Sequence, residues 1–244
     1  MLRNTVAIIF HFAGSVKAYH DLCHDRLRFD ALLAAIRPER CPHCGDQHTC
    51  IFWGSYQRWV YLSDDRCQVR IERVCCVMCG VTHALLPSFL HLFRRYTLTL
   101  IQQAIILALE TCVWGDRLAD AVAPYHQPAL ATLHEWVRSF LHGVERLLAW
   151  LQHTLVILAP LANLDPGHLP AYLPHCRSVT RRCAFTQGWQ FLRLAETLYA
   201  TCRADQPDLT FQFDALFAFL VAAMQTAGKV PRLLWRKPPA RAPT

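Results

Sequence analysis

Alternating hydrophobic and polar positions predict a β-hairpin in the first third of the chain. Val69 and Ile71 alternate with polar neighbours, and residues 51–62 are rich in aromatic and β-branched side chains. This period of two and this composition are typical of half-buried strands. The polar segment Ser63–Arg66 between the two runs has the residue types of a turn. A short apolar run that ends at Phe10 predicts a further strand.

Helical spacing replaces this pattern in most of the remaining chain. The second half of residues 17–36 is predicted to be helical and to end before Pro38. From Thr97 onward, apolar residues recur every three or four positions, which predicts one helix as far as Gly115, a short one over 117–122 and a third after Pro128. This order indicates a helix-turn-helix, although any three-helix bundle would give the same periodicity.

Two copies of one short pattern bracket the hairpin. Cys41-Pro-His-Cys44-Gly45 precedes it, and Cys76-Val-Met-Cys79-Gly80 follows it. Paired Cys-x-x-Cys motifs supply the four thiolates that Zn²⁺ prefers in a tetrahedral site. A glycine after each second cysteine permits positive φ, so that backbone N–H groups can point at the sulfurs. The sequence therefore predicts a zinc ribbon with one structural Zn²⁺; redox or packed structural cysteines are the alternatives.

The first metal ligand of the second motif could be either Cys75 or Cys76. Cys75 is also spaced suitably from Cys79, but neighbouring residues of a strand point to opposite faces, and Cys76 repeats the spacing of the first motif. His43 and His48 are less favoured substitutes as ligands. Four thiolates leave no coordination position for water, so such a site would be structural and not catalytic.

Composition and charge indicate which binding partners and which cellular compartment would suit the chain. The chain of 244 residues is 53% hydrophobic and has a net charge of +7, and its last stretch contains five basic residues without an acidic one. An acidic polymer or a membrane surface would suit this charge, as would a solvated tail. Twelve cysteines in a chain of this size, the best placed with metal spacing, favour a reducing cytoplasm. The longest apolar runs contain charged residues, so no membrane span is predicted.

Exposed positions near the start of the third predicted helix have donors and acceptors suited to DNA. Together with an arginine pair before the first helix of the bundle, they form the candidate DNA-binding set, which comprises Gln127, Thr132, His134, Arg138, Arg94 and Arg95. No acidic triad, phosphate-binding glycine loop or nucleophile motif is evident. We therefore expect no enzymatic activity.

Several segments together resemble a bacterial family of uncharacterised zinc-ribbon and helix-turn-helix proteins. They are the two cysteine motifs, Trp53-Gly-Ser-Tyr-Gln-Arg58, Ile71-Glu-Arg-Val74, Thr82-His-Ala-Leu-Leu-Pro-Ser-Phe89 and Arg94-Arg-Tyr96. The family is similar to the amino-terminal DNA-binding region of insertion-sequence transposases, and the resemblance covers about residues 5–140. It implies a cytoplasmic DNA-binding protein linked to mobile elements, with Cys41, Cys44, Cys76 and Cys79 as metal ligands and without a catalytic domain.

We therefore predict an α+β chain with a small zinc-ribbon hairpin followed by a mostly helical region. The expected parts are an amino-terminal strand and helix (1–39), the zinc ribbon (40–92), a helix-turn-helix bundle (96–159), a proline-rich linker (160–175), a carboxy-terminal helical region (176–228) and a basic tail (229–244). DNA binding is the favoured function. The alternatives are a protein-interaction module that uses the aromatic hairpin and the apolar helix 209–224, and a thiol-disulfide enzyme. The carboxy-terminal helices are candidates for an oligomer contact.

Overall fold

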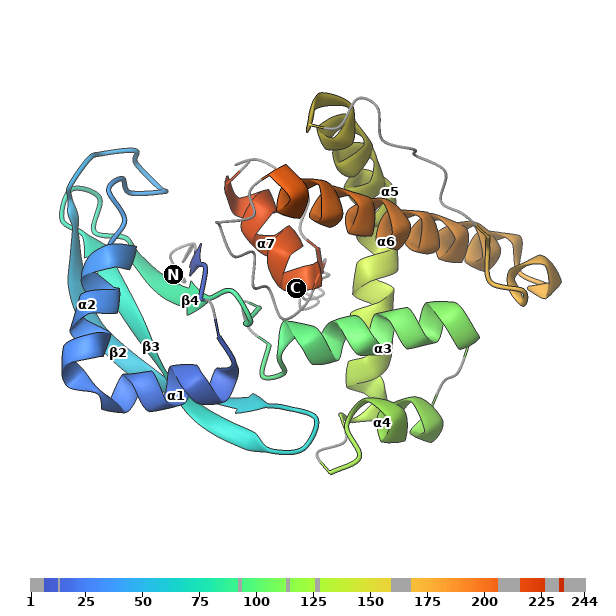
Figure 1. The fold of residues 1–244 in the computed structure, drawn as a ribbon, viewed down its shortest axis with the longest axis horizontal. Coiled ribbons are helices and arrows are strands. Elements are labelled where there is room, and N and C mark those ends of the chain that lie inside the picture. The colour runs from blue at the N-terminus through green and yellow to red at the C-terminus, as the bar shows by residue number, and fades with distance from the viewer. Residues whose placement is uncertain are drawn as a thin grey trace, which may run out of the picture. The chain divides into compact units, whose positions relative to one another are not determined.

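In its described part, the computed structural model contains a four-stranded sheet and seven α-helices, which confirms the predicted mixture of strands and helices (Figure 1). It describes residues 7–12, 14–91, 94–112, 115–125, 128–158, 168–205, 216–226 and 233–234. The chain forms two compact units, the first comprising residues 1–99 and 211–226 and the second residues 100–210 and 227–244. Residues 160–167 of the predicted proline-rich linker and all of the predicted basic tail except 233–234 lie outside the described residues.

The sheet of the first unit is built around the predicted hairpin. Its strands are β1 (Ile8–Phe10), β2 (Cys50–Tyr61), β3 (Arg66–Cys76) and β4 (Thr82–Pro87), in the spatial order β1-β4-β3-β2. The pairs β2–β3 and β3–β4 are antiparallel, whereas β1 pairs in parallel with β4. The sequence predicted β1, β2 and β3, but it did not reveal β4 or its pairing with β1. In this order β2 is the last strand of the sheet, opposite the β1 edge.

Two helices lie over this sheet, where the sequence predicted only the second. They are α1 (Val16–His24) and α2 (Arg26–Ile36), and Figure 1 shows them in front of β2 and β3. The Ser15 hydroxyl accepts from the Ala18 N–H and begins α1, and the Asp25 carboxylate accepts from the Arg28 N–H and begins α2. The predicted helix corresponds to α2, and the two caps lie so close together that α1 and α2 are separated by Asp25 alone.

Tyr19 of α1 lies at the centre of the core of this unit. The rings of Phe10, Phe12, Phe29 and Phe89 have their centroids between 5.1 and 6.4 Å from its ring. Its hydroxyl donates a hydrogen bond of 3.0 Å to the Arg70 carbonyl of β3, and burial raises the pKa of this phenol well above its usual value. The aromatic cluster thereby fixes α1 to the sheet.

Helix α7 (Leu216–Thr226) belongs to the first unit although it is the last helix in sequence. It contacts β1, and its residues 217–221 and Met224 are buried. The apolar helix predicted over 209–224 is thus helical and mostly buried in its described part. Residues 209–215 of that prediction lie outside the described residues.

The second unit is helical. It contains α3 (Leu98–Thr111, beginning at the boundary), α4 (Asp116–Val122), α5 (Leu130–Leu158), the 3₁₀ turn Leu173–His175 and α6 (Val179–Asp205). The helices α3, α4 and α5 occupy the positions of the three predicted helices. Helix α5 packs along α6 through an apolar stripe in which Phe140 meets Phe191, with ring centroids 5.6 Å apart. No helix among the described residues has both the length and the apolar composition needed to cross a bilayer.

The aromatic core of the first unit leads to a stability prediction. Phe29 is 3% exposed and packs against Tyr19 and the Arg70 guanidinium, so Phe29→Ala should lower the free energy of unfolding by about 3–5 kcal/mol. Leu27 in the same helix is 83% exposed, and Leu27→Ala should change it by less than about 0.5 kcal/mol. Urea unfolding followed by circular dichroism measures both. Equal effects of the two substitutions would contradict this description of the core.

Candidate functional site

The two Cys-x-x-Cys motifs form turns with the same backbone hydrogen bonds. In each turn the glycine N–H donates to the carbonyl of the first cysteine, at 2.8 Å for both Gly45 and Gly80. The N–H of the first cysteine donates to the carbonyl five positions later, at 2.9 Å for Cys41 and 3.0 Å for Cys76. Both glycines have positive φ, +83° and +65°, as the sequence predicted. The motifs are therefore two copies of one local structure.

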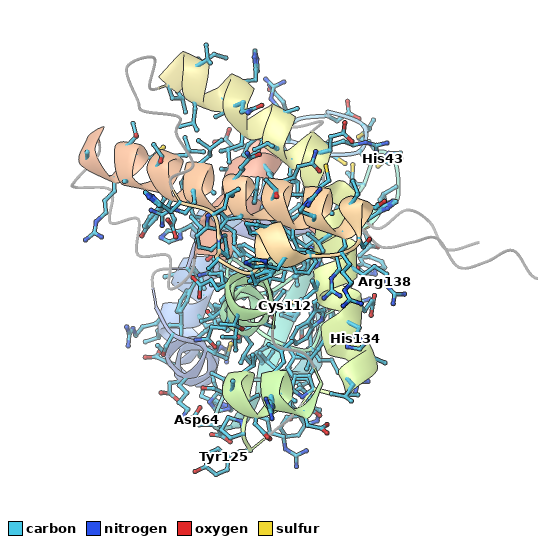
Figure 2. The ribbon with its side chains drawn as sticks, turned by 90° about the vertical axis from the view of Figure 1, so that its right-hand side faces the viewer. His43, Asp64, Cys112, Tyr125, His134 and Arg138 are labelled. Atoms are coloured by element: carbon cyan, nitrogen blue, oxygen red, sulfur yellow. The ribbon has the colours of Figure 1, made fainter. Side chains whose placement is uncertain are left out.

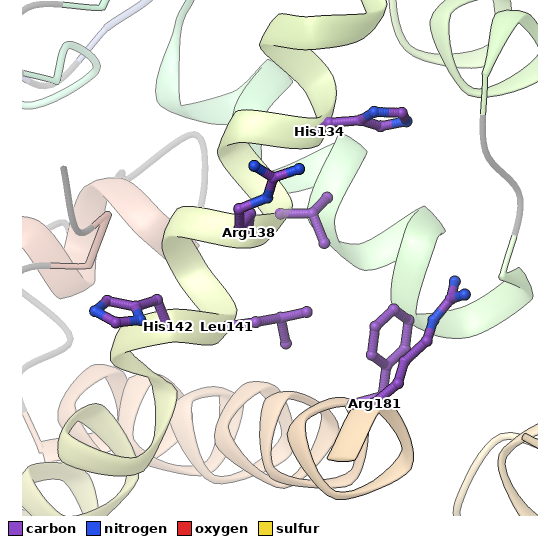
Figure 3. Close-up of a pocket in the computed structure, with 7 residues that line it drawn as sticks. His134, Arg138, Leu141, His142 and Arg181 are labelled. Atoms are coloured by element: carbon purple, nitrogen blue, oxygen red, sulfur yellow. The ribbon is translucent and has the colours of Figure 1, made fainter. Parts of the chain in front are cut away.

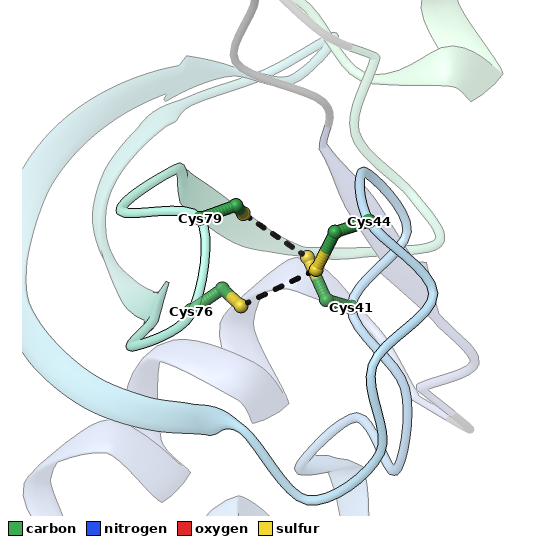
Figure 4. Close-up of side chains that lie close together, drawn as sticks. All are labelled: Cys41, Cys44, Cys76 and Cys79. Atoms are coloured by element: carbon green, nitrogen blue, oxygen red, sulfur yellow. Dashed lines mark hydrogen bonds between the residues drawn. The ribbon is translucent and has the colours of Figure 1, made fainter.

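These turns bring four sulfur atoms into one cluster. Cys41 Sγ lies 3.8 Å from Cys79 Sγ, and Cys44 Sγ lies 3.6 Å from Cys76 Sγ (Figure 4). All four sulfurs lie within 4.8 Å of one another. A zinc–sulfur bond of about 2.3 Å in a tetrahedron corresponds to a sulfur–sulfur distance of about 3.8 Å. The cluster therefore has the donors and nearly the dimensions of a four-thiolate metal site.

The cluster includes Cys76 and not Cys75. Cys75 is partly buried, and its thiol lies 3.7 Å from the Cys76 carbonyl, outside the group of four sulfurs. This is the arrangement that the strand alternation predicted for the two neighbours. Neither His43 nor His48 belongs to the group, and both are exposed. The geometry thus favours the preferred set of cysteines over the alternatives.

Three groups around the cluster can donate hydrogen bonds to its sulfurs. The Thr49 hydroxyl lies 3.2 Å from Cys76 Sγ and lowers the pKa of Cys76 to about 6, which favours the thiolate that a metal requires. The backbone N–H of His43 donates to Cys41 Sγ at 3.4 Å. His83 Nε2 also lies 3.4 Å from Cys41 Sγ, and this imidazole is fully buried.

His83 and Cys50 were not identified as part of the site from the sequence. His83 lies on β4, a strand that the sequence did not reveal, so no local spacing connected it with Cys41. Cys50 is buried at the start of β2, where burial and then the neighbouring Cys41 and Cys76 raise the pKa of its thiol to about 11. Cys50 therefore borders the cluster as a neutral thiol.

The metal content of two neighbouring cysteine variants tests the composition of the site. We expect about one metal ion per chain in the unmodified protein and in Cys75→Ser, because Cys75 contributes no sulfur to the cluster. Cys76→Ser removes one of the four donors and should lose most of the metal. Elemental analysis of protein purified without chelator measures both variants. Retention of metal by Cys76→Ser together with its loss from Cys75→Ser would reverse the assignment.

The buried imidazole leads to a second prediction about this site. His83→Phe removes a donor to Cys41 Sγ, and the loss of such a partner typically weakens metal binding about 10–100-fold. His43→Ala is the matched control, because it removes an exposed imidazole and keeps the backbone N–H that donates to the same sulfur. Competition with a chromophoric chelator gives the two affinities. Equal metal affinity in both variants would remove His83 from the site.

The candidate DNA-binding residues of the third predicted helix lie at the beginning of α5. His134 and Arg138, one turn apart, are exposed, and Thr132 is partly buried (Figure 2). Gln127 lies outside the described residues. Leu133, Trp136, Val137 and Phe140 form the buried side of this part of the helix, as predicted.

An open groove runs along this part of α5. It has a volume of about 700 Å³ and is lined by His134, Val137, Arg138, Leu141, His142, Arg181 and Phe185. Figure 3 shows His134, Arg138, Leu141 and His142 on α5 and Arg181 at the start of α6. Arg181 stacks over Phe185, with its guanidinium carbon 5.1 Å from the ring centroid. The lining contains two arginines, two histidines and no carboxylate.

The remaining candidates lie in the first unit. The Arg94 N–H donates to the His91 carbonyl, and the exposed Arg95 accepts a backbone hydrogen bond from the Tyr61 N–H. Within the second unit the structure groups His134 and Arg138 with His142 and Arg181. His142 and Arg181 were missed because Arg181 is far away in sequence and becomes a neighbour only through the packing of α6 on α5.

Comparison with protein families gives one match. Residues 41–114 match the model of a family described as a domain of unknown function (DUF6431). The matched region contains both cysteine turns, the strands β2, β3 and β4, and α3. No curated protein and no solved structure matches the chain.

Proposed function

We propose that the chain is a zinc-containing DNA-binding protein. In this proposal Cys41, Cys44, Cys76 and Cys79 hold one structural Zn²⁺, and the basic groove between α5 and α6 contacts the DNA backbone. The protein has no catalytic activity of its own and acts in the cytoplasm.

Zinc is the metal that best suits the cysteine cluster. Four thiolates are soft donors, and tetrahedral four-sulfur sites are typical of zinc and of iron–sulfur centres. Two turns with a glycine after each second cysteine, joined by a hairpin, are typical of zinc ribbons. Because all four positions are filled by protein, the ion would stabilise the ribbon and would not activate water.

The composition of the groove is the observation that most supports DNA binding. Arg138 and Arg181 carry permanent positive charge, and His134 and His142 can add donors. With no carboxylate in the lining, a phosphate would meet no opposing charge there. Phe185 and Leu141 supply an apolar floor. Such a surface suits the sugar of a nucleotide better than it suits a highly hydrated ion.

The proposed contact begins near the start of α5 and reaches no further than about its middle. Glu145 and Arg146 follow His142 on the helix, so the net charge of the exposed side chains falls beyond the groove. Arg94 and Arg95 of the first unit would add phosphate contacts of their own. Such contacts position a protein on DNA without reading its sequence.

The resemblance to transposase amino-terminal regions supports a narrower proposal. A protein with a ribbon and a three-helix segment but no acidic catalytic site would bind DNA as an accessory to a mobile element or as a derivative of a transposase. The exposed aromatic side chains of β2 favour a second candidate, a protein-interaction module with a structural zinc ribbon. A protein partner that remains bound after nuclease treatment and in high salt would support that candidate.

The groove predicts a specific loss of salt-sensitive binding. Arg138→Ala should weaken binding to a DNA duplex and reduce the slope of log K against log salt concentration by about one, because one phosphate contact is lost. Fluorescence anisotropy with a labelled duplex at several salt concentrations measures the slope.

Arg193→Ala is the matched control for this experiment. It removes the same charge from the same unit, but Arg193 lies outside the groove and pairs with Glu196 at 2.7 Å. The control should keep the original slope. If both substitutions weaken binding equally, net charge and not the groove determines the interaction.

A further inference from the structure

Among the described residues, the outer edge of β2 is occupied at both of its ends and open between them. At one end, the Tyr61 N–H donates to the Arg95 carbonyl at 2.8 Å, and the Thr97 N–H donates to the Tyr61 carbonyl at 3.3 Å. At the other end, Arg37 Nε donates to the Cys50 carbonyl at 2.9 Å. A bulge between Phe52 and Gly54 separates the hydrogen bond between Arg37 and Cys50 from the rest of the strand.

The direction of the backbone groups in the open part follows from Tyr61. Since Tyr61 turns both its N–H and its carbonyl away from β3, every second residue before it in the strand does the same. These residues are Trp59, Gln57 and Ser55, which lie on the Tyr61 side of the bulge. No hydrogen bond from the described part of the chain reaches their outward backbone groups.

The side chains of this edge are unusually apolar for an open strand. Trp53 is 60% exposed, Trp59 45% and Tyr56 39%. Natural proteins usually protect an open edge with charged residues, with proline or with a covering segment. Here Arg58 is the only charged residue of β2, and its guanidinium donates to the His91 carbonyl at 2.9 Å. The edge therefore lacks the usual protection against strand pairing.

We propose that this edge pairs with the same edge of a second copy of the chain. The two β2 strands would run antiparallel, with the two-fold axis at Gln57. The open part, Ser55–Trp59, is five residues long and its centre is Gln57, so that Ser55 of each copy lies opposite Trp59 of the other. Each opposed pair of outward residues then exchanges two backbone hydrogen bonds. This contact is independent of the proposed DNA binding.

The side chains suit this register. Tyr56 of one copy lies opposite Arg58 of the other, and Gln57 lies opposite its own equivalent, so no like charges meet. The same patch serves both partners, as a two-fold interface requires. A nucleic acid strand would meet one basic side chain on β2, and that side chain is already engaged by His91. These observations favour a second copy over DNA at this edge.

Charge at the central position tests both the contact and its register. The molar mass of the full-length, metal-loaded protein, measured by light scattering over a range of micromolar concentrations, should rise to twice the chain mass of 28.0 kDa. Gln57→Lys places two like charges opposite each other and should lower the dimer fraction at least tenfold. Gln68→Lys introduces the same charge on the same face, but on β3, whose side toward the proposed contact is already paired with β2, and it should leave the dimer intact.

Mixing two variants distinguishes this register from a general effect of charge or folding. Gln57→Glu alone should also be monomeric, but an equimolar mixture with Gln57→Lys should form a heterodimer, because opposite charges then meet at the axis. A protein that is monomeric at all concentrations would overturn the proposal. So would a dimer that persists in Gln57→Lys, or a mixture of the two variants that stays monomeric.

Discussion

The four cysteine sulfurs bring together two turns whose facing cysteines lie 32 and 38 residues apart in the chain. Cys41 and Cys44 follow α2, whereas Cys76 and Cys79 connect β3 with β4. When the sulfurs converge, the ends of β2 and β3 are placed beside each other, and Cys50 is opposed to Cys76 in the sheet. If a metal ion binds these sulfurs, its binding free energy is also free energy of folding for this part of the chain. The rest of the first unit is arranged around that fixed end of the hairpin.

The sequence allowed prediction of those parts of the structure whose causes are local. The spacing and glycines of the cysteine turns, the alternation at Val69 and Ile71 and the three-and-four spacing after Thr97 all depend on neighbours a few residues apart. They located the sulfur cluster, the hairpin and the helices α3, α4 and α5. Each of these features is set by backbone geometry that a short segment adopts by itself.

Other parts were missed because their causes lie far apart in the chain. The pairing of β1 with β4 joins Ile8 to Leu85, and the donor His83 reaches Cys41 through that same sheet. Helix α7 belongs to the first unit although about a hundred residues of the second unit precede it in the chain. Only packing brings such residues together, and a periodicity within one segment contains no signal of which other segment covers it.

The cysteine cluster also determines which residues β2 presents at its open edge. Because backbone groups of a strand alternate in direction, a shift of one residue in the pairing of β2 with β3 would turn Tyr56 and Arg58 outward in place of Ser55, Gln57 and Trp59. The hairpin turn fixes the register at one end, and the pairing of Cys50 with Cys76 beside the sulfurs fixes it at the other, with the bulge at Trp53 absorbing the extra residue between them. Loss of the cluster would leave only the turn to specify the register. A metal ion held by these four sulfurs would offer no coordination position for substrate, yet by fixing the register it would still influence what the surface of the hairpin binds.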